Sequence, residues 1–203
     1  MSKRIRAPWW YRTLVVLVVL LALGVASVFA WFYWWTPRQI ATAASDSVAQ
    51  FQTACSDHAT ETDTVIATLR LPGSNTDWPV TASDDVTGGL SWYQQTARPG
   101  HLGNMVVVGQ RLIAGGPLDS ILDINVGDPI VVQVCDMRYT YTVVVAPRDL
   151  TVQPADTWVL DPVPGEPSAM PTEAWLTLIA NQDIVPSADR AVGFARLTSS
   201  ESL

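Results

Sequence analysis

Residues 13–35 contain no charged side chain and are almost entirely apolar. A helix rises ~1.5 Å per residue, so this stretch reaches ~30 Å or slightly more, enough to cross the hydrocarbon core of a bilayer. Aromatic rings, which prefer the headgroup level of a membrane, frame it on both sides. The rings expected to flank this membrane anchor are Trp9, Trp10, Trp31, Trp34 and Trp35. The stretch therefore predicts one membrane-spanning helix in contact with the lipid bilayer.

Charge is unevenly distributed along the chain, whose formal net charge is −7. Four of the 12 basic residues lie within the first twelve positions, and the other 8 are set against 19 acidic residues, a net charge of −11 from residue 13 onward. Basic flanks stay in the cytoplasm, so we expect a single-pass protein of the cytoplasmic membrane with its C-terminal domain outside. The alternative is a signal peptide cleaved near residues 26–30, but the bulky aromatic residues that follow disfavour cleavage. The acidic remainder argues against nucleic acid as a partner.

The chain divides into three parts by composition. Residues 1–36 are the basic N-terminus and the anchor, residues 37–62 a helical neck with a linker, and residues 63–203 a folded domain. Thr36 and Pro37 suit the N-cap and first position of a new helix. Apolar residues then recur at helical spacing up to Phe51. Such a neck is either a spacer, which the sequence favours, or a docking helix for a partner.

From residue 63 onward, short apolar runs alternate with turn residues, which is typical of a mainly β barrel or sandwich. We expect strands at residues 65–71, from 78, and at 104–108, 129–134, 139–145, 175–180 and 191–197. Residues 135–138 predict a hairpin turn, and residues 157–160 a short strand or loop. No long helical pattern interrupts this part of the sequence.

Two cysteines, Cys55 and Cys135, both follow the anchor and are expected outside the cytoplasm. An even number in an oxidising compartment allows a disulfide between linker and hairpin, and the alternative is two free buried thiols. Neither His58 nor His101 has metal-ligand spacing to them. The acidic residues Asp84, Asp85, Asp119, Asp123 and Asp128 favour a solvated acidic face over a cation site. We therefore expect no metal and no cofactor.

A series of short motifs follows in order between residues 69 and 197. They are Leu69-Arg70-Leu71-Pro72, Trp78-Pro79-Val80, Pro99-Gly100-His101-Leu102-Gly103-Asn104, Val106-Val107-Val108-Gly109-Gln110-Arg111, Val126-Gly127-Asp128, Arg138-Tyr139-Thr140-Tyr141-Thr142-Val143, Trp158-Val159-Leu160-Asp161-Pro162, Leu176-Thr177-Leu178 and Ala195-Arg196-Leu197. In this order they resemble the sortase family, most closely the class E sortases of high-GC Gram-positive bacteria. The resemblance implies a closed eight-stranded β-barrel on the outer face of the cytoplasmic membrane, behind a single N-terminal anchor.

The resemblance also implies three catalytic positions. In active sortases a cysteine thiolate attacks a peptide carbonyl of a sorting signal, a histidine handles the proton and an arginine steadies the oxyanion. Here the histidine position holds Gln110, the cysteine position holds Asn181, and the arginine position is kept as Arg190. An amide does not titrate near neutrality and offers no thiolate. This departure predicts a pseudo-sortase with no catalytic residue, and a chain that is not an enzyme.

Three functions compete on this sequence. The first is a structural or accessory subunit of a membrane protein complex. The second is a peptide-binding module in which Gln110, Asn181 and Arg190 hydrogen-bond to each other or to an extended peptide, although Arg190 is equally able to pair with Asp183 or Asp189. The third and least favoured is an active cysteine transpeptidase that uses other residues, since His101 is expected far from the Asn181 end of its strand.

Overall fold

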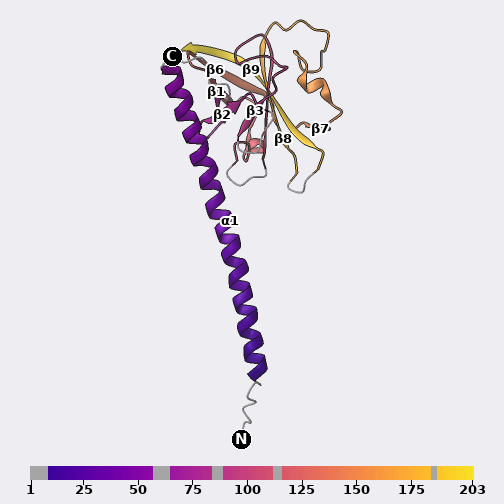
Figure 1. Ribbon diagram of the computed structural model, residues 1–203. Helices are drawn as coiled ribbons and strands as arrows, with labels where there is room; N and C mark the ends of the chain where they lie inside the picture. The colour runs from indigo at the N-terminus through magenta and orange to yellow at the C-terminus, as the bar shows by residue number, and fades with distance from the viewer. Residues whose placement is uncertain (1–8, 57–64, 84–88, 112–115, 184–186) are drawn as a thin grey trace.

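The computed structural model describes residues 9–56, 65–83, 89–111, 116–183 and 187–203. One helix, α1 (Trp9–Ser56), precedes a β domain (Figure 1). The strands are β1 (Val65–Arg70), β2 (Trp78–Thr81), β3 (Leu90–Trp92), β4 (Gly103–Gly109), β5 (Pro129–Gln133), β6 (Met137–Val145), β7 (Thr151–Val152), β8 (Ala174–Asn181) and β9 (Arg190–Ser202). Two short 3-10 helices, η1 (Ile121–Asp123) and η2 (Thr157–Leu160), lie in the connections.

Eight of these strands close into a barrel. Their order is β6-β5-β1-β2-β3-β4-β8-β9, and β9 pairs with β6 to complete the ring. The pairs β2–β3 and β4–β8 are parallel, and the other six pairs of the ring are antiparallel. The short strand β7 pairs with the first residues of β9. The predicted mainly β, closed eight-stranded barrel is therefore confirmed.

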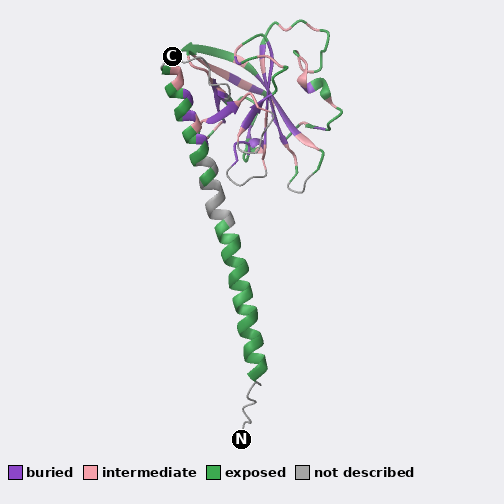
Figure 2. Cartoon of the chain, in the orientation of Figure 1, coloured by how far each residue is buried: buried purple, intermediate pink, exposed green. Residues whose placement is uncertain are grey.

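Successive side chains of a strand point to opposite faces, and both faces of β4 are buried. Met105 and Val107 point into the barrel, where they join the main core with Leu69, Tyr141 and Leu178. Val106 and Val108 point outward into a second, smaller core. The outer core consists of Val106, Val108, Val145, Leu150, Val152, Val159, Leu160, Trp175, Ile179, Val192 and Phe194. Figure 2 shows the buried residues gathered along the strands. The connection that carries β7 and η2 thus covers one outer face of the barrel.

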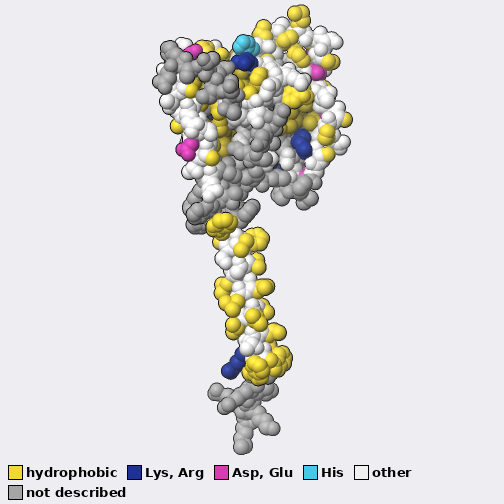
Figure 3. All heavy atoms as spheres, in the orientation of Figure 1, with side chains coloured by type: hydrophobic (Ala, Val, Ile, Leu, Met, Phe, Trp, Pro, Cys, Tyr) yellow, Lys and Arg dark blue, Asp and Glu magenta, His cyan; other side chains and the backbone are white. Residues whose placement is uncertain are grey.

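Helix α1 is continuous over 48 residues. The sequence suggests a new helix after Thr36, but the structure continues through Pro37, so that expectation is wrong. Proline has no N–H to donate and its ring crowds the carbonyl four residues earlier, so the helix passes Pro37 at a cost that the rest of its 48 residues outweighs. The segment Trp9–Trp31 is long and apolar enough to cross a membrane, and no part of it is buried in the protein. Figure 3 shows its hydrophobic side chains exposed along the helix.

The other end of α1 lies against the barrel. Ala44, Val48 and Phe51, which share one face of the helix, are buried, and α1 contacts β1 and β2. This apolar face, predicted from its helical spacing, therefore packs on the protein's own barrel. Trp34 and Trp35 lie within α1, but their side chains fall outside the described part of the chain.

Some local expectations differ from the structure. Residues 157–160 form a 3-10 helix, η2, and β3 and β7 were not foreseen because two or three residues show no periodicity. The hairpin is present as expected, with β5 and β6 antiparallel around residues 134–136. His58, Asp84 and Asp85 lie outside the described residues.

Candidate functional site

Gln110, Asn181 and Arg190 lie at the ends of three neighbouring strands. β4 and β8 are parallel and in register up to Val108 and Ile179, and Gln110 follows β4 as Asn181 ends β8. Asn181 pairs directly with Arg190, the first residue of β9. Continuing the register by two residues places Gln110 level with Asn181 on the adjacent strand. The structure thus brings the three predicted positions together.

The same three side chains belong to one face of the sheet. Val106 and Val108 precede Gln110 at even spacing, Ile179 precedes Asn181, and Val192 follows Arg190. All four of these apolar residues line the outer core rather than the barrel interior. Because side chains alternate along a strand, Gln110, Asn181 and Arg190 extend this outer face toward solvent. All three are half-buried, so they remain accessible at the edge of the outer core.

A tight contact fixes where β4 ends. A Cβ built on Gly109 would lie 2.7 Å from Cδ2 of Leu90 and 2.8 Å from Cδ1 of Leu118. Any larger residue would push these buried leucines apart. Glycine at this position lets Leu90 of β3 and Leu118, just before η1, pack over the end of the barrel. This packing fixes where β4 ends and therefore where Gln110 lies.

Arg190 is held by backbone oxygens. Its Nη1 donates to the carbonyls of Ser187 and Asp189, each at 3.0 Å. Among the described residues it forms no ion pair with Asp183 or Asp189. The loop is closed by a hydrogen bond of 3.1 Å from the backbone N–H of Gln182 to the carbonyl of Asp189. The acid pairing considered for Arg190 is therefore absent from this part of the structure, and its guanidinium stays at the strand end.

Two residues beside these positions escaped sequence reasoning. Arg111 donates through Nη1 to the carbonyl oxygen of Gln182, which ties the end of β4 to the end of β8. The Oε1 atom of Gln182 is buried and has no hydrogen-bond partner among the residues that the structure describes. The available signal was that both residues directly follow a predicted site position.

A buried polar cluster fastens the connection that carries η2 to the outer face of the barrel. Asn104 is 1 % exposed and donates through Nδ2 to the carbonyls of Val159 (2.9 Å) and Asp161 (3.1 Å). Its Oδ1 accepts a hydrogen bond of 2.6 Å from the hydroxyl of Thr177, which is fully buried. A buried amide satisfied in this way fixes its neighbours strongly, because each group would be costly to leave unpaired. The cluster therefore holds η2 against β4 and β8.

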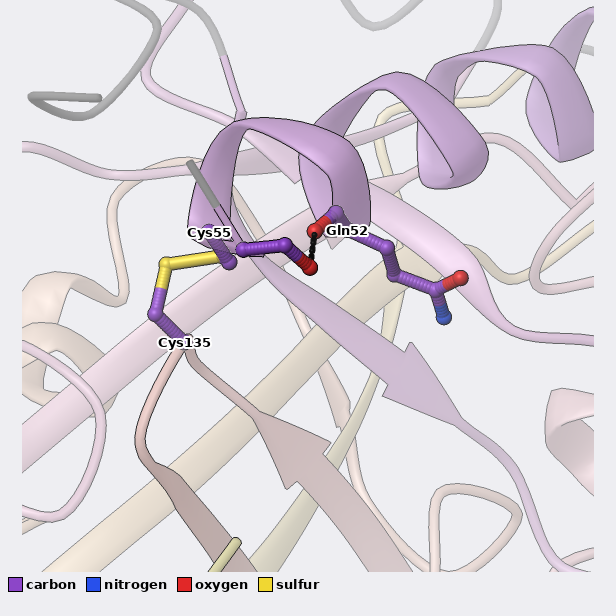
Figure 4. The surroundings of a disulfide bond; sticks show 4 residues. Gln52, Cys55 and Cys135 are labelled. Atoms are coloured by element: carbon purple, nitrogen blue, oxygen red, sulfur yellow. Dashed lines mark hydrogen bonds between the residues drawn. A yellow bond between two sulfur atoms is a disulfide. The ribbon is translucent and has the colours of Figure 1, made fainter. Parts of the chain in front are cut away.

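Both cysteines lie beside the opposite end of β9, one in α1 and one in the β5–β6 hairpin. Cys55 and Cys135 form a disulfide, with their Cα atoms 5.1 Å apart, that joins the last turn of α1 to the β5–β6 hairpin (Figure 4). The backbone N–H of Leu203 donates to the carbonyl of Asp136 (3.0 Å), so the C-terminal end of β9 lies here too. Thirteen residues of β9 span ~40 Å of strand, and Arg190 begins that strand. The structure therefore does not bring the cysteines to the other predicted positions.

His101 also lies away from Asn181. Gly103, two residues later, pairs with Ala174 at the start of β8, whereas Asn181 ends that strand. A pocket of about 150 Å³ places His101 with Arg98, Val134 and Tyr139, next to the hairpin. We call the region of Cys135, His101 and Leu203 the disulfide end, and the region of Gln110, Asn181 and Arg190 the site end. No group of three or more His, Cys, Asp or Glu side chains arranged to hold a metal occurs among the described residues.

The disulfide end also contains a buried phenol. Burial raises the pKa of Tyr141 to about 12, and this outweighs a hydrogen bond of 2.8 Å that its hydroxyl accepts from the backbone N–H of Gly100. Gly100 has a φ of +75°, and a Cβ there would lie 2.3 Å from the ring of Tyr139. Glycine is thus required at this turn both by its backbone conformation and by the space available.

The chain is similar to known proteins in sequence and in structure. A sortase domain matches residues 62–198. Sortase E from Streptomyces avermitilis is 27% identical with a TM-score of 0.60, over 69% of this chain and 91% of that one. SrtF sortase from Corynebacterium diphtheriae is 20% identical with a TM-score of 0.64, over 71% and 89%. Sortase E1 from Streptomyces coelicolor, solved with a tripeptide in the active site, is 23% identical with a TM-score of 0.60, over 69% and 91%. No curated protein sequence is similar enough to count as a match.

These matches overturn one expectation. The sequence predicts a chain that is not an enzyme, and this prediction is wrong, because a sortase domain and solved sortases point to a family of transpeptidases. The amides at Gln110 and Asn181 are departures at two positions within an enzyme family, and on their own they do not show that the reaction is lost. A sortase domain that matches more than half of the sequence, on a barrel of the same fold, shows that this chain belongs to the sortase family.

Proposed function

We propose that this protein is a membrane-anchored member of the sortase family that holds an extended peptide at the site end of its barrel. Trp9–Trp31 crosses the cytoplasmic membrane with the basic N-terminus inside, and the barrel lies on the outer face. The observation that carries the proposal is the meeting of Gln110, Asn181 and Arg190 on one face of three adjacent strand ends.

The chemistry of these groups suits a peptide backbone. Each amide side chain can donate and accept hydrogen bonds, and a guanidinium donates from a planar group of five N–H bonds. A peptide in extended conformation presents alternating N–H and C=O groups that need such partners. The tripeptide in the active site of sortase E1 from Streptomyces coelicolor supports a peptide at the corresponding face of this barrel.

The family points to transpeptidation as the reaction class. Both cysteines of this chain are in the disulfide, so a free thiol is not present beside Asn181. An assay of peptide transfer to an amine acceptor, run on the protein with its disulfide intact, therefore accompanies the binding measurement. Turnover would add a reaction to the proposed binding, and its rate in an Asn181→Ala variant would show whether the amide takes part.

The test is titration of a sorting-signal pentapeptide, acetylated and amidated, against the full chain in lipid nanodiscs. Removing a charge-assisted hydrogen bond costs about 1.5–3 kcal/mol, so Arg190→Ala is expected to weaken binding at least tenfold. Arg138→Ala is the matched control, because Arg138 pairs with Glu201 (3.4 Å) at the disulfide end. Absence of binding to the natural chain, or equal losses in both variants, would overturn the proposal.

A second role, as an accessory subunit of a membrane protein complex, is supported by α1. Its whole apolar segment is exposed, with Leu21 and Phe29 more than 70 % accessible, and is available for contact with other membrane helices as well as lipid. Extraction in mild detergent followed by native mass spectrometry tests this role. Co-purifying membrane proteins would support it, and a protein that migrates alone as a monomer would refute it.

A further inference from the structure

We propose that α1 is a rigid strut that turns the site end of the barrel toward the membrane and holds it at a fixed height. The inference rests on the membrane anchor proposed above and does not depend on peptide binding. It follows from three features of the helix: its continuity, its two attachments to the barrel, and the direction in which the strands run from those attachments.

The first attachment is the buried face of α1. Ala44, Val48 and Phe51 are each less than 10 % exposed and pack on the barrel beside β1 and β2. Three positions spread over two turns fix both the tilt of a helix and its rotation about its own axis. A single contact would leave the barrel free to pivot.

The second attachment is the disulfide. Cys55 lies one turn beyond Phe51, and its bond to Cys135 closes a loop of 80 residues between the helix and the hairpin. A pocket of about 330 Å³ at this junction is lined by Phe51, Gln52, Cys135 and Leu203, among others. The last turn of α1, the hairpin and the end of β9 therefore meet at one corner of the molecule.

The direction of the strands follows from that corner. α1 runs toward it from the membrane-spanning segment, and β9 runs toward it from Arg190. Their starting points both lie away from the corner. Figure 1 shows the connected ends of β8 and β9 directed toward the same side as the N-terminal part of α1, with the disulfide end above them. The site end is therefore the membrane-facing end of the barrel.

The height of the barrel above the bilayer is set by the length of helix between the membrane-spanning segment and the docked face. From Trp31 to Ala44 the helix advances ~20 Å, which is the reach available between the bilayer surface and the first docked residue. The site end lies within this interval, because it extends back from the docked face toward the membrane. A polypeptide close to the bilayer surface would meet this end of the barrel first.

The test measures energy transfer from a fluorescent residue in the full chain to an acceptor lipid in phosphatidylcholine vesicles. The fluorophore replaces Ala188 at the site end or, as the matched control, Leu102 at the disulfide end, both exposed. The two positions flank the opposite ends of β8, which spans ~23 Å between its first and last residues. We expect higher transfer from Ala188 than from Leu102, and loss of that difference when the strut is broken.

Two insertion variants, each with residues added between Thr42 and Ala43, distinguish a rigid strut from a flexible tether. Seven alanine-rich helical residues would raise the barrel by ~10 Å, so transfer should fall at both positions while the difference between them persists. Seven glycine and serine residues should abolish the difference. The joint change Cys55→Ser and Cys135→Ser should reduce it, provided that the β signal in circular dichroism is unchanged.

Equal transfer from Ala188 and Leu102 in the natural chain would overturn the strut, as would a difference that survives the glycine and serine insertion. Flotation of the same vesicles is the independent control for the anchor. A chain that does not float with lipid refutes the membrane anchor itself, whereas a chain that floats but shows equal transfer refutes only the strut.

Discussion

The two ends of the barrel are built in different ways. The disulfide end is closed by a covalent bond, by the turn at Gly100 against Tyr139 and Tyr141, and by the hydrogen bond from Leu203 to Asp136. At the site end, the described residues are joined by hydrogen bonds: from Arg111 and Arg190 to backbone carbonyls, and from the backbone N–H of Gln182 to Asp189. One end thus uses its residues to stabilise the fold, while the other leaves polar groups half-buried at the surface.

This contrast shows where binding groups can be placed on a small barrel. A group that must exchange partners with a ligand cannot also be fixed by burial, because an unpaired buried polar group costs ~1–3 kcal/mol. The Asn104–Thr177 cluster lies between the two ends. Its buried amide and hydroxyl groups are hydrogen-bonded to each other and to backbone carbonyls, so none of them is left to bind a ligand. The rigid part of the site is therefore buried, and the groups available for binding extend from it.

Loss of the disulfide is expected to lower the stability of the protein more than any other change considered at either end. Cys55→Ser with Cys135→Ser opens an 80-residue loop, and we expect the free energy of unfolding to fall by about 3–4 kcal/mol. Urea unfolding in detergent micelles, followed by near-UV circular dichroism, measures this. A change below about 1 kcal/mol would show that the docked face of α1 secures this end without the covalent bond.

The buried phenol at the disulfide end should make stability fall at high pH. The pKa of Tyr141 is raised from about 10 in the unfolded chain to about 12, so the folded state retains its proton where the unfolded state has lost it. Stability is fully present below pH 10 and is expected to fall by about 1 kcal/mol at pH 11 and about 2 kcal/mol near pH 12. Urea midpoints between pH 9 and pH 12 measure this loss. Tyr141→Phe should remove this part of the pH dependence, and an unchanged slope would contradict the assignment.

The buried cluster below the site end can be broken at one hydroxyl. Thr177→Val leaves Oδ1 of Asn104 without its donor, and we expect a loss of about 2 kcal/mol together with faster hydrogen exchange in the connection that carries η2. Thr177→Ser keeps the hydroxyl and is the matched control. A valine variant as stable as the natural chain, beside a less stable serine variant, would show that Thr177 contributes packing of its methyl group rather than the hydrogen bond.

The smallest expected effect tests the alignment of the site end. In an Asn181→Cys variant, the added change Gln110→His should speed alkylation of the new thiol at neutral pH by up to about tenfold, because an adjacent imidazole lowers a thiol pKa. Alkylation rates from intact mass against pH measure this. Arg111→His is the control, since Arg111 is the next residue along the chain and its guanidinium is bonded to the carbonyl of Gln182, and equal acceleration by both changes would contradict the shared face of Gln110 and Asn181.

Much of the architecture was readable from the sequence. The uncharged apolar run at residues 13–35 predicted a membrane-spanning helix. The short strands predicted a barrel or sandwich, and the resemblance to sortases implied the closed barrel. Continuous helix through Pro37 was missed, because a proline that begins a helix and one that is tolerated within a helix look alike in sequence. The short strands β3 and β7 were missed because their pairing comes entirely from neighbours distant in sequence.

Residue types are fixed before folding, so the amino-acid sequence alone sets which chemical groups this protein can offer a ligand: two amides and a guanidinium at positions 110, 181 and 190. Folding placed these groups on one face, brought Cys55 and Cys135 together at the opposite end, and packed the C-terminal part of α1 against the barrel. These relations depend on strand register and on how the barrel closes, and both are set by contacts between segments far apart along the chain.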